Sequence, residues 1–193
     1  MKIGEARQKY SVQIRAYGEA KANLEKQREE LEKKKTSESI SLTEYDKASA
    51  TLDLSYQAVS EKYEAYRTFM ADLLEVETGI FNAEVARQQG DAMAEYALDM
   101  CKLFEVARRI AQGAHVPAED ERKLMEFSME LYQSAKSMAA MNEMNDKEYD
   151  TLWPDEEKEE VPDAHEVAEN TTLGLHAPDV VSVEETIASA VSE

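Results

Sequence analysis

The stretch TSESISLTEYD, residues 36–46, decides the fold because it separates two long helical patterns. Ser41 and Glu44 have the spacing of a capping box, in which a serine hydroxyl and a glutamate carboxylate accept hydrogen bonds from backbone N–H groups at a helix start. Ile40 and Tyr45 flank this pair at the spacing of a hydrophobic staple. The stretch therefore predicts that one helix ends here and that a second helix begins at once.

Before this stretch, residues 3–35 predict a long helix with a thin apolar seam. The seam has one strong apolar residue in every seven: Ile3, Tyr10, Tyr17, Leu24 and Leu31. A spacing of seven residues places side chains on one face of a helix. The polar run KANLEKQREELEKKK, residues 21–35, mixes Glu with Lys and Arg, so we interpret it as a solvated helix face and not as a nucleic-acid-binding arm.

After the stretch, residues 42 to about 78 predict a second long helix. Its apolar residues follow the pattern of a coiled-coil seam that contains aromatic side chains: Leu42, Tyr45, Leu52, Tyr56, Val59, Tyr63, Tyr66, Met70, Leu73 and Ile80. Because the connecting turn is short, we expect the two helices to form an antiparallel hairpin. The contact is expected to run through Leu24, Leu31, Leu52 and Val59.

The thin seam of the first helix predicts that the hairpin needs additional cover. One strong apolar residue per heptad buries little apolar area. We therefore expect another chain to help, either through a homo-oligomer formed along the hairpin or through docking of a different protein there.

The apolar pattern changes register between Gly79 and Gly90. Glu77 stands where an apolar residue is due, and the pattern resumes out of step with the earlier heptads as Met93, Tyr96, Ala97, Met100, Phe104, Ala107 and Ile110. We expect a kink or a break between the two glycines, with a continuous bent helix as the alternative.

The stretch IAQGAHVPAEDE, residues 110–121, predicts a helix end followed by a helix start. Gly113 suits a helix C-terminus, Pro117 suits a first helical turn, and the acidic residues that follow complement the helix dipole. We expect a fourth helix from about Pro117 to about Met141. Its inward residues are expected to be Leu124, Phe127, Leu131, Ala135 and Met138.

Sulfur-containing residues concentrate in this second half. Seven of the nine Met lie between residues 93 and 144. They could form a pliable peptide-binding surface, but their helical spacing favours an interpretation as core residues. Cys101 is the only cysteine, and we interpret it as a small buried helical residue that forms no disulfide.

The composition changes abruptly at residue 143. Residues 143–193 contain 16 Asp and Glu but only 2 Lys, and so carry -14 of the formal net charge of -19. Such a segment cannot bury enough apolar surface to offset its ordering entropy, so we expect it to be largely disordered.

Two apolar islands interrupt the acidic segment and are the candidate partner-binding residues. The first island is Tyr149, Leu152 and Trp153, and the second is Val183, Ile187 and Val191. In the second island Ser182 and Glu185 repeat the capping-box spacing, which predicts a short helix.

Isolated anchors in an acidic chain are typical of segments that fold on binding to a protein with a basic or apolar groove. We therefore expect Trp153 to be at least partly exposed in the free protein and the last stretch to become helical with a partner. The alternative is that Trp153 covers the end of the helical body.

The sequence indicates no catalytic, cofactor-binding or metal-binding residues, and no cofactor. None of His115, His165 or His176 has a Glu three positions before it, and no phosphate-binding or nucleophile motif occurs. The charge of -19 argues against binding to nucleic acid or to anionic membranes. No apolar run approaches the roughly 20 residues that span a bilayer, and residues 1–12 lack a signal-peptide core, so the expected location is the cytoplasm.

The sequence thus predicts an all-α protein, because Gly and Pro are scarce and the helical patterns are long. The expected parts are a coiled-coil hairpin over residues 1–80, a helical pair over 81–142 and an acidic docking tail over 143–193. The function expected is a non-enzymatic interaction module, an adaptor or a chaperone-like assembly factor. The alternative is an enzyme or small-molecule binder with a pocket among the second to fourth helices.

Overall fold

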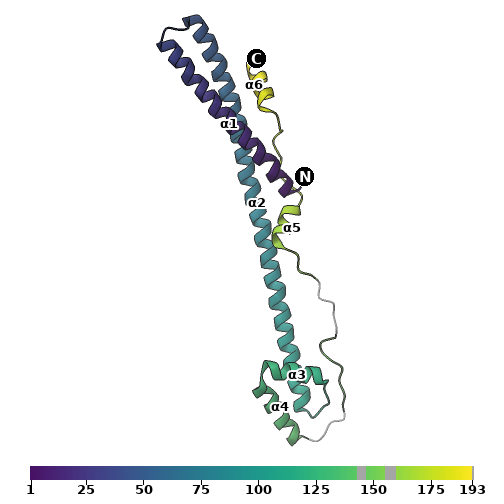
Figure 1. The fold of residues 1–193 in the computed structure, drawn as a ribbon. Helices are drawn as coiled ribbons and strands as arrows, with labels where there is room; N and C mark the ends of the chain where they lie inside the picture. Colours follow the sequence, from purple (N-terminus) through teal and green to yellow (C-terminus); the bar gives the residue numbers. More distant parts are fainter. Residues whose placement is uncertain (143–146, 155–159, 193) are drawn as a thin grey trace. The chain divides into compact units, whose positions relative to one another are not determined.

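The computed structural model describes residues 1–142, 147–154 and 160–192, and within these residues the chain is all-α, as predicted (Figure 1). The helices of this described part are α1 (Ile3–Thr36), α2 (Leu42–Ala111), α3 (Ala118–Phe127), α4 (Met129–Met141), α5 (Ala164–Asn170) and α6 (Val183–Ser192). Extended pairing in the same residues is limited to two isolated backbone bridges, Lys2 with Thr172 and His115 with Glu148.

The chain divides into two compact units. The hairpin unit consists of Met1–Glu84 together with Pro162–Glu193, and the α3–α4 unit consists of Val85–Val161. The expected boundary near residue 80 lies close to the observed one. The expected tail of residues 143–193 is instead divided, because its first part belongs to the α3–α4 unit and its last part to the hairpin unit.

The turn between α1 and α2 contains the predicted capping box. The Ser41 backbone N–H donates to Glu44 Oε2 at 3.3 Å, and the Glu44 N–H donates to Ser41 Oγ at 3.3 Å. The hydrogen bonds from Ser41 lower the pKa of the Glu44 carboxyl below its ordinary value. The cap fixes the first residue of α2 as the sequence indicates.

The two helices of the hairpin run antiparallel, as predicted (Figure 1). Polar pairs along their length give the direction, because residue numbers fall in α1 as they rise in α2. The pairs are Glu32 with Tyr45, Arg28 with Asp53, Glu25 with Tyr56, and Arg7 with Glu77.

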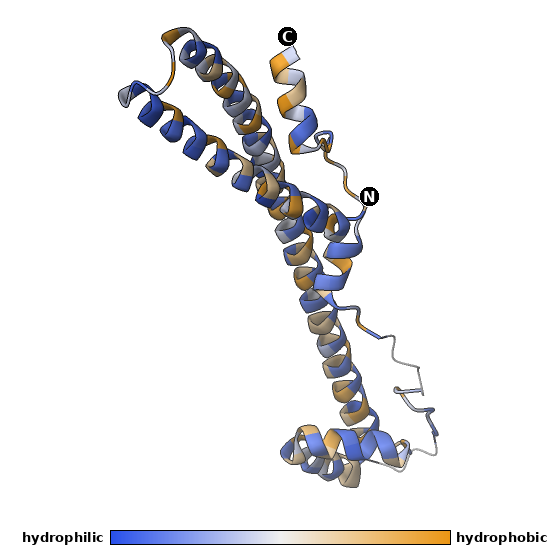
Figure 2. Cartoon of the chain, turned by 45° about the horizontal axis from the view of Figure 1, so that its top comes forward, coloured by the Kyte–Doolittle hydropathy of each residue, from blue (hydrophilic) through white to orange (hydrophobic). Residues whose placement is uncertain are grey.

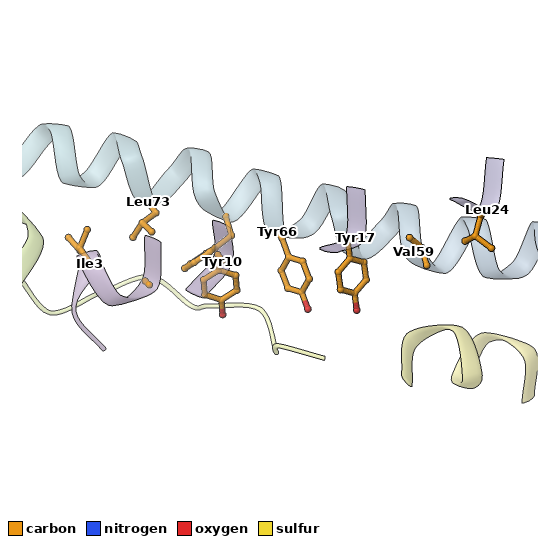
Figure 3. Packing of buried hydrophobic residues seen from close by; sticks show 9 residues of the cluster. Ile3, Tyr10, Tyr17, Leu24, Val59, Tyr66 and Leu73 are labelled. Carbon is orange, nitrogen blue, oxygen red and sulfur yellow. The ribbon is translucent and has the colours of Figure 1, made fainter. Parts of the chain in front are cut away.

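The hairpin core consists of residues from both helices: Ile3, Ala6, Tyr10, Tyr17, Leu24, Val59, Tyr66, Phe69 and Leu73. Aromatic rings form its centre, with ring centroids 4.5 Å apart for Tyr10 and Phe69 and 5.3 Å apart for Tyr17 and Tyr66 (Figure 3). The predicted contact residues Leu24 and Val59 are buried in this core, and Leu52 packs against it. Leu31 is half-buried and lies outside the core.

α2 continues without interruption from Leu42 to Ala111, so the expected break between Gly79 and Gly90 does not occur. The alternative of a continuous helix is the one observed. Glycine costs a helix only about 1 kcal/mol relative to alanine, because it keeps its backbone N–H and its φ and ψ angles can be helical. The change of apolar register therefore changes which face is apolar without ending the helix.

The α3–α4 unit has its own core, formed by Leu103, Val106, Ala107, Ile110, Leu124 and Ala135. The prediction of one helix from about Pro117 to about Met141 was wrong. Ser128 is extended, with φ -158° and ψ 106°, and separates α3 from α4. Its hydroxyl accepts a hydrogen bond from the Leu131 N–H at 3.1 Å, which makes it the N-cap of α4.

The break at Ser128 changes which side chains face inward. Leu124 and Ala135 are buried as expected, but Phe127 and Met138 are exposed, because α4 does not continue the line of α3. Met93, Met129 and Met141 are exposed as well, so the interpretation of the methionines as core residues fails for four of them. Cys101 is also exposed, contrary to expectation.

A cavity substitution tests the hairpin core. Val59 is fully buried, so Val59→Ala should lower the free energy of unfolding by about 2 kcal/mol. The measurement is urea denaturation followed by far-ultraviolet circular dichroism. Val12 is exposed on α1, and Val12→Ala should change the stability by less than about 0.5 kcal/mol. Equal effects of the two substitutions would contradict this packing.

Candidate functional site

The C-terminal segment, residues 162–192, lies along the hairpin (Figure 1). This differs from the expectation of a largely disordered tail, since α5 and α6 are both formed here. Apolar side chains of the segment pack against the hairpin core: Leu173, Leu175, Ala177, Val180, Val183 and Ile187. The apolar area that the thin α1 seam lacks is thus supplied by the chain itself.

Three buried tyrosines, Tyr10, Tyr17 and Tyr66, form the surface that we call the tyrosine face. Their rings belong to the hairpin core and their hydroxyls point to the same side, toward the C-terminal segment (Figure 3). The Tyr10 hydroxyl donates to the Pro178 carbonyl oxygen at 2.6 Å, and the Tyr66 hydroxyl donates to that of Asp179 at 2.9 Å.

Tyr66 also binds the segment as an acceptor. Its hydroxyl oxygen accepts a hydrogen bond from the Val181 N–H at 3.2 Å. Tyr66 therefore contacts both the donor and the acceptor side of the extended backbone between residues 179 and 181.

Tyr17 binds the start of α6. Its hydroxyl lies 3.1 Å from the carbonyl oxygens of Val181 and Ser182, and 2.6 Å from the Thr186 hydroxyl. The Glu185 N–H donates to Ser182 Oγ at 3.1 Å, so the predicted N-cap of this helix is formed. Thr186 is buried against Tyr17 although its side chain is polar, because its hydroxyl has these partners.

The other end of the segment pairs with the first residues of the chain. The Ile3 N–H donates to the Thr171 carbonyl at 3.1 Å, and the Leu173 N–H donates to the Met1 carbonyl at 3.0 Å. These two bonds enclose the antiparallel bridge between Lys2 and Thr172. The segment is therefore held by its backbone near residue 172 and again near residue 180.

Arg7 links three helices at this end. Its guanidinium forms ion pairs with Glu77 of α2, at 2.6 Å, and with Glu169 of α5. The Glu77 side chain is only 13% exposed. Glu77 interrupts the apolar pattern of α2, and the structure gives the reason. The Glu77 carboxylate forms an ion pair with Arg7, which also pairs with Glu169 of the C-terminal segment.

The charges of the segment complement those of the helix that it contacts. Residues 162–192 contain six Asp and Glu and no Lys or Arg. α1 contains nine Lys and Arg and six Glu. α1 thus has an excess of basic residues, and one of them, Arg7, pairs with Glu169 of the segment.

The two islands have separate positions. Val183 and Ile187 of the second island pack against the hairpin core, and Val191 is exposed. The first island belongs to the α3–α4 unit, where Leu152 and Trp153 pack against the core of that unit. The two islands therefore belong to different units, and their binding to another protein stays a prediction.

Asp120 holds the first island in place. Its carboxylate is fully buried and accepts hydrogen bonds from Thr151 Oγ1 at 2.6 Å and from the Leu152 N–H at 3.1 Å. The indole Nε1 of Trp153 donates to Asp99 Oδ1 at 2.8 Å. These bonds fix residues 151–153 on α2 and α3.

Cations surround the aromatic rings of the first island. The ammonium groups of Lys123 and Lys102 lie 4.5 Å and 5.5 Å from the Trp153 ring centroid, and the Arg109 guanidinium lies 4.1 Å from that of Tyr149. Trp153 is half-buried. In the free chain it therefore covers the helical body, which is the alternative that the sequence left open, while part of its ring stays accessible.

Sequence reasoning missed the roles of the tyrosines and of Asp120. Tyr10, Tyr17 and Tyr66 match a coiled-coil seam, and only their hydroxyls, which a core must satisfy, indicate a polar partner. Asp120 matches the acidic first turn of a helix, and no pattern in the sequence connects it to Thr151.

Two further features bear on the chemistry of the site. Among the described residues, no three His, Cys, Asp or Glu side chains are grouped as metal ligands. No helix in the described ranges is both long and apolar enough to cross a membrane.

The tyrosine face predicts a specific response to alkali. Burial raises the pKa of both the Tyr10 and the Tyr17 hydroxyl above the ordinary value of 10.0, and for Tyr10 the neighbouring Tyr66 and Asp179 add to the rise. Because the folded state favours the neutral phenols, their contribution to stability is complete below pH 10 and is lost as the pH rises through the raised values. Absorbance at 295 nm should show tyrosines that ionise at a pH above the ordinary range.

The absorbance change at this higher pH should be smaller in Tyr10→Phe and in Tyr17→Phe than in the unmodified chain. The exposed Tyr96 supplies the control, since Tyr96→Phe should leave the contribution of the buried tyrosines unchanged. If all nine tyrosines ionised together near the ordinary value while the helices stayed intact, the burial of these hydroxyls would be contradicted.

The first island can be tested through its own fluorescence, since Trp153 is the only tryptophan. Asp120→Ala removes the acceptor of the Thr151 hydroxyl and of the Leu152 N–H, and should lower the stability of the α3–α4 unit by about 1–3 kcal/mol. Trp153 emission should shift to longer wavelength. Glu119→Ala at the exposed neighbouring position should leave the emission unchanged, and an unchanged spectrum in Asp120→Ala would disprove the role of Asp120.

Comparisons with known proteins complete the description of the site. No protein-family model, no curated protein and no solved structure matches this chain.

Proposed function

We propose that the chain is a non-enzymatic protein–protein interaction module, an adaptor or an assembly factor, which engages its partner through the hairpin seam and the acidic C-terminal part. The observation that supports this proposal is the hydrogen bonding of three buried tyrosine hydroxyls to consecutive parts of an extended backbone, residues 178–182. A rigid helical surface with donors at these positions is suited to holding a polypeptide.

The tyrosine face combines a general and a selective kind of contact. Backbone carbonyls occur in every polypeptide, so the hydroxyls give affinity for an extended chain of many sequences. Selectivity comes from the side chains between them, where Val180 and Val183 pack on the core and Thr186 bonds Tyr17. A partner segment should accordingly be extended, apolar at the positions of Val180 and Val183, and followed by a capped helix.

The C-terminal segment occupies the tyrosine face in the free chain, so a partner has to displace it. The segment belongs to the same chain, so it competes with a partner as an intramolecular ligand at a high effective concentration. A partner therefore needs either high local concentration or additional contacts. Displacement would also release the six acidic residues of the segment, which can attract a basic surface on the same partner.

A labelled peptide with the sequence of residues 171–192 tests this proposal by fluorescence anisotropy. Val180→Glu with Ile187→Glu, made in the full chain, places charges on the packed side of the segment and should vacate the tyrosine face. This released variant should bind the peptide at least about 10-fold more tightly than the unmodified chain does, because the tethered competitor is gone.

Substitutions on the tyrosine face complete the test. Adding Tyr17→Phe and Tyr66→Phe to the released variant should weaken peptide binding, because the carbonyl oxygens lose their donors. Adding Tyr96→Phe, at an exposed position of α2, should leave binding unchanged. Equal binding by all variants, or none by the released variant, would refute the proposal.

A further inference from the structure

The α3–α4 unit has an exposed apolar stripe on its part of α2. The stripe consists of Met93, Tyr96, Met100 and Phe104, which recur at steps of three and four residues and so lie on one face of the helix. Met93 is 74% exposed, Tyr96 65% and Phe104 54%. Met100 is half-buried and joins the stripe to the core of the unit.

The surroundings of the stripe are also apolar. Ala92, Ala94, Ala97 and Cys101 are all exposed on the same stretch, residues 91–101, which contains only three charged residues, Asp91, Glu95 and Asp99. In Figure 2 this part of α2 shows less of the blue that marks hydrophilic residues than α1 does. A helix of this composition is ordinarily buried, and an exposed apolar patch of this kind marks an interaction surface.

We propose that a second copy of this chain covers the stripe, with the two α2 helices packed antiparallel about a two-fold axis near Tyr96 and Ala97. In this arrangement Met93 of each copy lies opposite Met100 of the other, so the same stripe serves both sides of the interface. Gly90 has no side chain and Ala97 has only a methyl group, so the helices can approach closely.

Electrostatics favour a second copy as the occupant. The chain has a net charge of -19, so most surfaces of two copies repel each other. Residues 85–111 of α2 carry no net charge, with four basic and four acidic residues. The charges of the stretch around the stripe, such as Asp91, Glu95 and Lys102, lie on the opposite face of the helix, so the two stripes can meet without bringing like charges together.

The area is sufficient for a reversible dimer. Tyr96, Phe104 and Met93 of two copies, with the alanines between them, would bury on the order of 1,000 Å², which is the lower range for a specific interface. The interface does not involve the tyrosine face. The proposed dimer therefore goes beyond the proposed function, and a failure of one proposal would not affect the other.

Sedimentation velocity of the full chain over a wide concentration range tests the proposal. The unmodified protein should shift from monomer to dimer as the concentration rises. Tyr96→Glu places a carboxylate at the centre of the interface and should weaken dimerisation by at least about 30-fold. The far-ultraviolet circular dichroism should not change, because Tyr96 is exposed in the monomer.

Leu98 provides the matched control. It is 63% exposed, only two residues away on the same helix, and lies on the opposite face. Leu98→Glu adds the same charge and should dimerise like the unmodified protein. A monomer at every concentration, or equal effects of the two substitutions, would overturn the proposal, and the former outcome would assign the stripe to a different protein.

Disulfide trapping locates the axis. In a Cys101→Ser background, Ala97→Cys places two thiols across the proposed two-fold axis, and mild oxidation should give a covalent dimer of the full chain. Leu98→Cys in the same background places its thiol away from the partner and should give no covalent dimer. Cross-linking through residue 98 and not through residue 97 would show that the opposite face pairs, and would overturn the arrangement.

Discussion

The hydroxyl groups of three core tyrosines are the constraint on which the hairpin unit depends. Tyr10, Tyr17 and Tyr66 fill the centre of the seam with their rings, but a buried hydroxyl without a hydrogen-bond partner costs free energy. In this structure the three hydroxyls find acceptors outside the two helices, on the backbone of residues 178–182.

The same requirement explains why the C-terminal segment is ordered in spite of its composition. Its apolar residues are few, and its acidic residues repel each other in isolation. On the hairpin, Val180, Val183 and Ile187 reach an apolar surface, and Glu169 reaches Arg7. The hairpin and the segment are thus incomplete separately and complete each other, which is the relation between a binding surface and its ligand.

Most of the fold follows from patterns that are local in the sequence. The capping box at Ser41 and the heptad spacing predicted the turn, both long helices and their antiparallel direction, because caps and helical periodicity depend on residues a few positions apart. The single helix expected across Ser128 was wrong, since the same serine that fits a helix interior can also cap a new helix.

The long-range contacts could not be predicted in this way. The bonds of Tyr10 and Tyr17 join residues separated by more than 160 positions, and no spacing rule connects such residues. Acidic composition predicted a disordered segment because it measures what the segment can bury by itself. The composition of the segment gives no information about a complementary surface elsewhere in the chain, and α1 has such a surface.

Hydrogen exchange at the Val181 amide tests the central claim most directly, because this N–H donates its hydrogen bond to the Tyr66 hydroxyl. In the unmodified chain the amide should be protected, and Tyr66→Phe should speed its exchange about 5- to 150-fold, the effect of losing about 1–3 kcal/mol of local stability. If the Val181 amide of the unmodified chain exchanged as fast as that of an unstructured peptide, the C-terminal segment would not be bound to the hairpin and the account would be contradicted.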